Sequence, residues 1–251
     1  MSRVAVVGPG SVGTFFAAHL AAAGNDVVAC ARRPFREYVV DSPESPVRVP
    51  AHVVTDPEEL AGPAEWVLVT VKAHHTDGAA PWLRQLCRAS TKVVVIQNGV
   101  EGAERVAPHA GDAEVVPAVV YCGAELLEPG HIAHRQDGTL ILPDTPTGHQ
   151  VVELFVGTPA VVRATDRYLT DAWRKLGLNV MFNGITALTM RPIGVVSRPG
   201  GPAASTSGRS PDRARCALRR GGAGRASPWH PHAAVRGLRR AARRRRPGPR
   251  A

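Results

Sequence analysis

The chain has 251 residues and a net charge of +10, but fifteen of its basic residues are arginines within residues 197–251, where one acidic residue occurs. Residues 1–196 carry a net charge of −4, so a nucleic-acid function inferred from the overall charge would depend on the C-terminal segment alone. No apolar run reaches the roughly 18 residues of a membrane span, and the four cysteines lack the spacing of a metal site or a disulfide framework. A strand pattern at the very start leaves no room for a signal peptide, so we expect a cytoplasmic protein with reduced thiols and no metal.

The first 33 residues predict a strand, a helix and a second strand in the stretch RVAVVGPGSVGTFFAAHLAAAGNDVVACARR. Residues 4–7 form a continuous apolar run, which is typical of a strand buried on both faces of a parallel sheet. A helix is expected from about residue 11 to residue 23, and Gly24 suits the left-handed position after its end. Residues 27–31 predict the second strand.

The turn between the first strand and the helix contains a G-x-G-x-x-G motif formed by Gly8, Gly10 and Gly13. Gly8 allows a tight turn, Gly10 lets the backbone approach a pyrophosphate, and Gly13 lets the helix pack against the strand. The free N–H groups at the start of the helix, from Ser11 and Val12, would point at the phosphates. In this strand–turn–helix context the motif predicts dinucleotide binding.

The residue after the second strand indicates which dinucleotide is bound. Enzymes that use NAD place Asp or Glu there to hold the ribose 2′-hydroxyl, whereas this chain has Arg32 followed by Arg33. A guanidinium can hold a 2′-phosphate through paired charge-assisted hydrogen bonds. We therefore predict NADP(H) in preference to NAD(H); the alternative is that Arg32 is a solvated surface arginine in an arginine-rich protein.

Further buried strands are predicted along the chain, and two of them end in polar side chains. A strand over residues 66–71 stops at Lys72 and is followed by a helix through about residue 87, and the strand over residues 93–96 ends at Asn98. Because the carboxyl ends of parallel strands face the ligand crevice, both side chains are candidate site residues. Additional strand patterns occupy residues 114–126 and 138–143.

A helix with two contrasting faces is predicted within residues 166–196. Its apolar positions are Leu169, Trp173, Leu176, Val180 and Ile185. Lys175, Asn179 and Asn183 recur every fourth residue and so lie along one stripe. A stripe with one cation, two amides and no acid could bind an oxygen-rich anion, although it could also be a solvated face. Residues 1–196 contain only three lysines, which suggests that Lys175 has a role that arginine cannot fill.

Taken together, these motifs resemble the 2-dehydropantoate 2-reductase, or ketopantoate reductase, family. The resemblance covers residues 2–196 and includes VTVKA at Lys72, QNG at Asn98, EPGHIAH around Gly130, and WRKLGLNVMFNGITAL. It implies reduction of 2-dehydropantoate to (R)-pantoate with NADPH, a step toward pantothenate and coenzyme A. It also implies an α/β Rossmann-type domain with a doubly wound parallel sheet in residues 1–165, followed by an all-helical substrate domain that begins at residues 166–196.

The resemblance also assigns roles to individual residues. It makes Lys175 the catalytic lysine, whose ammonium would polarise the keto oxygen and donate a proton. It places Asn179 and Asn183 at the hydroxyl end of the substrate, and Asn98 near the nicotinamide and the substrate. Lys72 would lie near the cofactor, and Arg32 would contact the 2′-phosphate.

The arginine-rich segment, residues 197–251, departs from the family pattern at the point where further helices are expected. Arg, Pro, Gly and Ala dominate it and apolar side chains are scarce, so we expect a disordered tail. The absence of lysine favours a shifted reading frame or a degenerate end over a functional nucleic-acid-binding arm. Three hypotheses stay open: a reductase of ketopantoate or a related 2-oxo acid, an NADP-binding remnant with poor turnover, and a Rossmann body with a nucleic-acid-binding tail. A homodimer is also left open.

Overall fold

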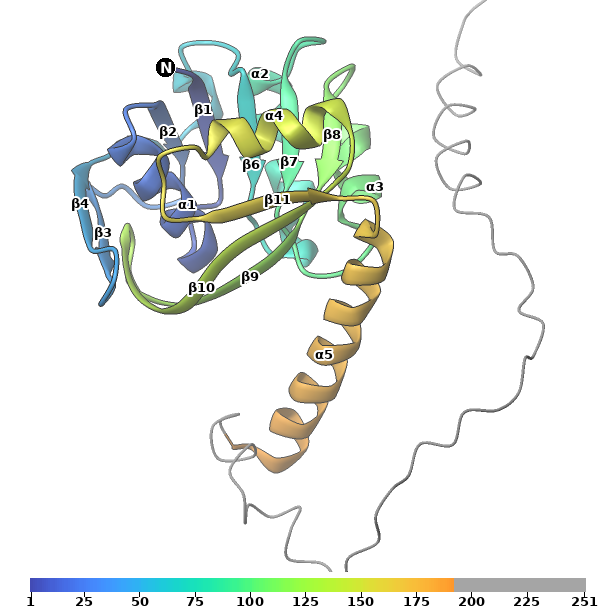
Figure 1. Ribbon diagram of the computed structural model, residues 1–251. Helices are drawn as coiled ribbons and strands as arrows, with labels where there is room; N and C mark the ends of the chain where they lie inside the picture. Colours follow the sequence, from blue (N-terminus) through green and yellow to red (C-terminus); the bar gives the residue numbers. More distant parts are fainter. Residues whose placement is uncertain (192–251) are drawn as a thin grey trace, which may run out of the picture. The chain divides into compact units, whose positions relative to one another are not determined.

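The computed structural model describes residues 1–191, all of which belong to one compact unit (Figure 1). The expectations for residues 192–196 and for the arginine-rich segment, including its disorder, lie outside the described residues. None of the described helices is long and apolar enough to cross a membrane.

A six-stranded parallel sheet forms the centre of the molecule, with the strand order β5-β2-β1-β6-β7-β8. Its strands are β1 (Arg3–Val7), β2 (Asp26–Cys30), β5 (His52–Val54), β6 (Trp66–Val69), β7 (Lys92–Val95) and β8 (Glu114–Pro117). The order places β2 and β6 on opposite sides of β1, which is the arrangement of a doubly wound α/β fold. The predicted fold class of this domain is therefore confirmed.

Helices cover both faces of this sheet. Alternate residues of each strand point to opposite faces, and both faces are apolar, so each face is buried by a helix. Helix α1 (Ser11–Ala22) packs on the face that carries Val4 and Val6. Helix α2 (Ala80–Leu86) packs on the face that carries Ala5 and Val7. The remaining short helices are η1 (Pro57–Glu59), η2 (Ala73–His75), η3 (Asp77–Ala79), α3 (Gly102–Val106), η4 (Ala107–His109) and α4 (Pro146–Leu154).

The prediction of a single helix from Lys72 to about residue 87 is wrong. Two 3₁₀ turns, η2 and η3, precede an α-helix, α2, that is much shorter than expected. Pro81 lies in the first turn of α2 and has no N–H to donate to the carbonyl of Asp77. A continuous α-helix through this point would lack that hydrogen bond, so the α-helix begins at Ala80.

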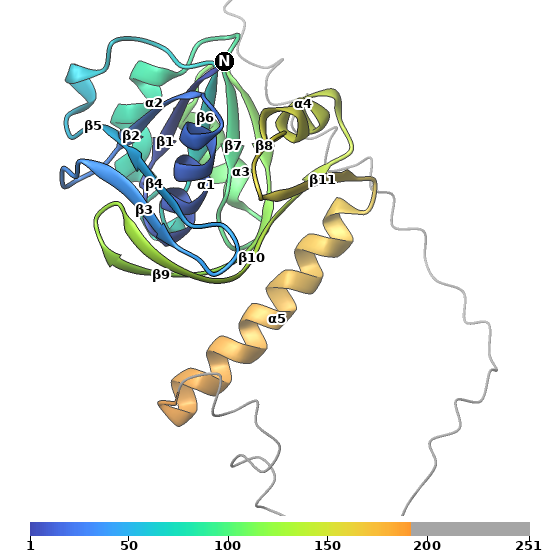
Figure 2. The same cartoon turned by 60° about the vertical axis from the view of Figure 1, so that its left-hand side comes forward.

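A second, five-stranded sheet covers the outer side of α1, as Figure 2 shows. Its order is β11-β10-β3-β4, and β9 also pairs with β10. The strands are β3 (Glu37–Asp41), β4 (Val47–Pro50), β9 (Val119–Glu128), β10 (His131–Pro143) and β11 (Val161–Thr165). The strand pattern predicted over residues 114–126 is thus divided between two sheets. Helix α1 is buried between them, and its Phe15 and Phe16 are at most 1% exposed.

Helix α5 (Tyr168–Thr189) is the long helix that the polar stripe predicted. Only its first turns lie against β9 and β10, and the rest extends beyond them (Figures 1 and 2). The expected burial of its apolar face is therefore not seen within the described part of the chain. Trp173 is 59% exposed and Val180 is 66% exposed, while Ala172 is buried against Val119 and Ile141.

We predict that Gly13→Ala destabilises the chain, because a Cβ at Gly13 would overlap the Thr70 hydroxyl and lie 3.1 Å from the Gly8 carbonyl oxygen. Overpacking of this kind typically costs about 1–3 kcal/mol, to be measured by urea unfolding of the full chain. Gly177→Ala in α5 is the matched control. No described atom lies within 4 Å of a Cβ there, and alanine favours a helix by up to about 1 kcal/mol. Equal unfolding midpoints for the two variants would contradict this packing.

Candidate active site

The turn after β1 is held in one geometry by hydrogen bonds and by close packing. The N–H of Gly8 donates to the Cys30 carbonyl at 3.0 Å, and the Thr70 hydroxyl donates to the Gly8 carbonyl at 2.8 Å. Gly8 has φ +82°, and a Cβ there would overlap the Val71 side chain. Only glycine fits position 8, because any side chain would be strained and would collide with Val71, two residues after β6.

The start of α1 leaves backbone donors available to a ligand. The first helical hydrogen bond runs from the Thr14 N–H to the Gly10 carbonyl at 2.8 Å, so the N–H groups of Ser11, Val12 and Gly13 precede the hydrogen-bonded ladder. The helix has no side-chain cap and no acidic residue in its first turn. A Cβ at Gly10 would meet only the Gly8 carbonyl oxygen, at 4.0 Å. These features fit a pyrophosphate bound close to the backbone.

A cavity of about 570 Å³ lies beside this turn, at the carboxyl ends of β1, β2 and β6. Among the residues selected from the sequence, Gly8, Gly10, Arg32 and Lys72 line it. The structure adds five basic or aromatic residues to its wall: Arg33, Phe35, His74, His75 and Trp82. The described residues that line the cavity include five basic side chains and no acidic one, so it favours an anionic ligand.

Gln97 fixes the segment that carries Lys72 and the two histidines. It is buried at the end of β7, and its amide nitrogen donates to the Val71 carbonyl at 2.9 Å and to the Thr76 hydroxyl at 3.2 Å. The Thr76 hydroxyl in turn donates to the Ala73 carbonyl at 2.8 Å. Sequence reasoning selected the neighbouring Asn98 instead. A polar residue that directly continues a buried apolar run was the available signal for Gln97.

The other end of the same sheet edge carries the lysine of the polar stripe. The Nζ atom of Lys175 lies 4.1 Å from the centre of the Tyr121 ring, within the range of a cation–π interaction. Tyr121 lies in β9, four residues after the carboxyl end of β8, and it packs, as Val100 does, against the small buried cluster of Val119, Ile141 and Ala172. Asn98 is exposed two residues before Val100 and does not line the cavity. The structure thus places Lys175 and the loop after Asn98 in one neighbourhood, at the β7–β8 end of the edge.

The surroundings of Lys175 change its proton affinity. Desolvation lowers the pKa of Lys175 below the usual lysine value, while the negative charge of Asp137 acts in the opposite direction. Asp137 lies at an irregularity of β10 and has φ +61°, a left-handed conformation that is uncommon outside glycine. Lys175 is therefore a half-buried ammonium that releases its proton more readily than a fully hydrated lysine does.

Asn179 and Asn183 follow Lys175 along α5, one and two turns farther from the sheet. Asn179 is half-buried and Asn183 is exposed, and neither lines the cavity. The structure confirms that all three residues share one continuous helix. The assigned roles of the two asparagines stay predictions.

Comparison with known proteins finds consistent relatives. Residues 4–147 match the family model described as "Ketopantoate reductase PanE/ApbA". The chain is 39% identical over 204 residues to the 2-dehydropantoate 2-reductase of Caulobacter vibrioides, which covers 80% of this chain and 69% of the relative. It is 41% identical over 180 residues to that of Mycobacterium tuberculosis, which covers 71% of this chain and 61% of the relative. The chain therefore spans about two thirds or less of these relatives' lengths.

A solved structure extends the similarity to the fold. The crystal structure of a PanE/ApbA family ketopantoate reductase from Ralstonia eutropha superposes with a TM-score of 0.69 at 32% sequence identity. The superposition covers 78% of this chain and 68% of the other. Both the sequence and the arrangement of the described elements are therefore similar to those of ketopantoate reductases.

We predict that Gln97→Met destabilises the chain, because methionine fills the space but leaves the Val71 carbonyl without its donor. Loss of a buried hydrogen-bond partner costs about 1–3 kcal/mol in urea unfolding. Amide exchange in residues 72–76 should also become faster. Gln85→Met, on the exposed surface of α2, is the control and should change stability by less than about 0.5 kcal/mol. Unchanged stability and exchange in Gln97→Met would show that Gln97 does not anchor this segment.

Proposed function

The chain belongs to the ketopantoate reductase family, and on this premise we propose that it binds NADPH and reduces 2-dehydropantoate to (R)-pantoate. One observation carries the proposal: a basic cavity lies at the carboxyl ends of β1, β2 and β6, and a half-buried lysine lies against Tyr121 of β9, shortly after the carboxyl end of β8. The cavity suits the phosphates of a dinucleotide, and the lysine suits the oxygen of a 2-oxo acid. Hydride transfer to a keto group requires both.

The glycine turn and the basic wall would hold the cofactor at the β1–β2 end of the edge. The free N–H groups of Ser11 and Val12 would bind the pyrophosphate, and Arg32 would pair with the 2′-phosphate. An Asp or Glu in the place of Arg32 would repel that phosphate. When bound, NADPH supplies the hydride. The basic wall supports NADPH over NADH, because NADPH alone carries the 2′-phosphate.

Lys175 would act at the other end of the edge. Its ammonium would donate a hydrogen bond to the keto oxygen, stabilise the negative charge that develops there, and deliver a proton to it. The face of the Tyr121 ring holds the ammonium in position, and partial desolvation eases release of the proton. The Asp137 charge helps to keep Lys175 protonated before the reaction. Asn179 would bind the hydroxyl end of the substrate.

The preference for NADPH can be tested by reversing one charge. We expect Arg32→Asp to remove most of the preference for NADPH over NADH, a change of about 1–3 kcal/mol for a charge-assisted contact. Fluorescence titration with both cofactors measures it. Arg36→Asp is the matched control, because Arg36 is exposed and does not line the cavity. Equal affinity of the unmodified chain for NADPH and NADH would refute the predicted preference.

The role of Lys175 can be tested by comparing two substitutions. We expect Lys175→Ala to lower kcat/KM for 2-dehydropantoate by about 100- to 10,000-fold, the usual contribution of a positioned acid. Lys175→Arg should not restore the rate, since a guanidinium keeps its proton at neutral pH. NADPH affinity should be preserved in both variants.

Lys92→Arg is the control, because Lys92 also lies over an aromatic ring, that of Trp66, but at the opposite, amino end of β7. It should leave kcat/KM unchanged. Full activity in Lys175→Arg would exclude Lys175 as the proton donor, and failure of the unmodified chain to oxidise NADPH with 2-dehydropantoate would exclude the proposed reaction.

A further inference from the structure

Two histidines that the sequence did not single out, His74 and His75, form part of the cavity wall. His74 and His75 lie in η2, directly after Lys72, and both line the cavity together with Arg32. Their ring centres are 4.2 Å apart. Both side chains are exposed, so a ligand in the cavity can reach them.

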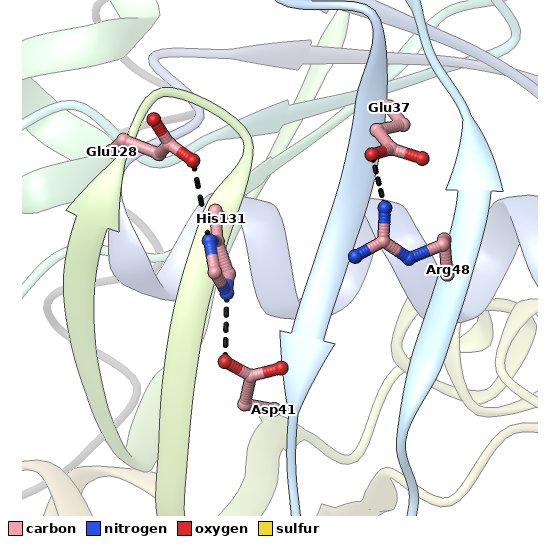
Figure 3. Close-up of polar contacts among 5 residues, drawn as sticks. All are labelled: Glu37, Asp41, Arg48, Glu128 and His131. Carbon is pink, nitrogen blue, oxygen red and sulfur yellow. Dashed lines mark hydrogen bonds and ion pairs between the residues drawn. The ribbon is translucent and has the colours of Figure 1, made fainter.

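These histidines differ in their partners from three other histidines of the described chain, His109, His131 and His149. His131 lies between two carboxylates, with its Nε2 2.7 Å from Asp41 and its Nδ1 3.4 Å from Glu128 (Figure 3). The two carboxylates raise the pKa of His131. His109 and His149 likewise contact carboxylates, those of Asp77 and Asp144. No carboxylate contact is found for His74 or His75 within the described residues.

The charged groups that face His75 are instead cationic. Desolvation lowers the pKa of His75, and the charges of His74, Arg32 and Lys72 lower it further. Arg33 lines the same cavity. The nearest acid along the chain, Asp77, does not line the cavity, and its carboxylate lies 3.4 Å from the Nε2 of His109. An anion bound among these groups would raise the pKa of His75, because its negative charge favours the protonated imidazole.

Resting on the function proposed above, we propose that His74 and His75 belong to the subsite for the 2′-phosphate, and that their protonation makes the preference for NADPH over NADH depend on pH. The placement supports this, because the pair adjoins Arg32 and Lys72 on a wall that receives cations from the segments after β2 and after β6. The pair thus adds a specificity-determining element to the cofactor site.

The sign of the pH dependence follows from linkage. A bound phosphate raises the pKa of a neighbouring histidine, so NADPH binding takes up a proton. The added affinity is fully present below the pKa of the free protein and is lost as the pH rises through the higher pKa of the complex. NADH lacks the 2′-phosphate, so its affinity should not change through these histidines.

The test is a fluorescence titration of the full chain with NADPH and with NADH at about pH 6.5 and about pH 8, across the range where histidines titrate. We expect the ratio of the two affinities to fall on the order of tenfold at the higher pH. His75→Gln should lower the ratio at the lower pH and flatten its pH dependence. His75→Lys keeps a permanent charge, so it should retain the preference at both pH values. His149→Gln, outside the cavity, is the control and should behave like the unmodified chain.

A second measurement does not depend on the folding of any variant. Adenosine 2′,5′-bisphosphate should raise the pKa of the His75 imidazole, followed by NMR of the unmodified chain, whereas adenosine 5′-monophosphate should not. A preference for NADPH that is independent of pH, or an unchanged His75 pKa, overturns this inference and leaves the proposed function intact. Equal affinity for NADPH and NADH at both pH values contradicts the cofactor choice itself.

Discussion

The turn from β1 to α1 packs so closely against the end of β6 that positions 8 and 13 have no room for a side chain. At Gly8 the obstacle is Val71, and at Gly13 it is the hydroxyl of Thr70, which also donates to the Gly8 carbonyl. This contact fixes where α1 begins and therefore where its free N–H groups point. It also places the segment after β6, with Lys72, next to the same turn. The cofactor site proposed here depends on this one close approach.

The sheet edge separates two tasks that need different electrostatic environments. At the β1–β2 end, cations gather around an open cavity, where a phosphate can neutralise them. At the β7–β8 end, Lys175 lies against the Tyr121 ring and loses part of its hydration, which suits a group that must release a proton. A dinucleotide that extends along the edge would connect the two ends. The proposed phosphate site and the proposed proton donor therefore come from segments more than 100 residues apart in the sequence.

Local sequence patterns predicted the elements whose apolar or polar residues recur at a regular spacing. The strand from Arg3 to Val7, the helix that follows it and the long helix with Lys175 were all recognisable, because their periodicity is regular. The second sheet was not predicted as a sheet. Its β10 pairs with β3, which lies some 90 residues earlier, and β9 and β10 are partly exposed, so neither composition nor alternation reveals the pairing.

The sequence predicted only those site residues that belong to a recognisable motif or follow a recognisable strand. Arg32 and Lys72 could be selected because each follows a strand with a recognisable ending. The roles of Gln97 and Tyr121 come from contacts made in three dimensions; the position of Gln97 after an apolar run could have marked it as a candidate, but not its partners. His75 was missed because a histidine near a strand end has many ordinary explanations, and only its place on the cavity wall distinguishes it.

A crystal structure of the chain with NADP⁺ would test the central claim most directly. The account predicts the pyrophosphate against the N–H groups of Ser11 and Val12 and the 2′-phosphate within hydrogen-bonding distance of Arg32. The nicotinamide should extend along the sheet edge toward Asn98 and Lys175. A 2′-phosphate in solvent, or a nicotinamide directed away from Lys175, would contradict the account.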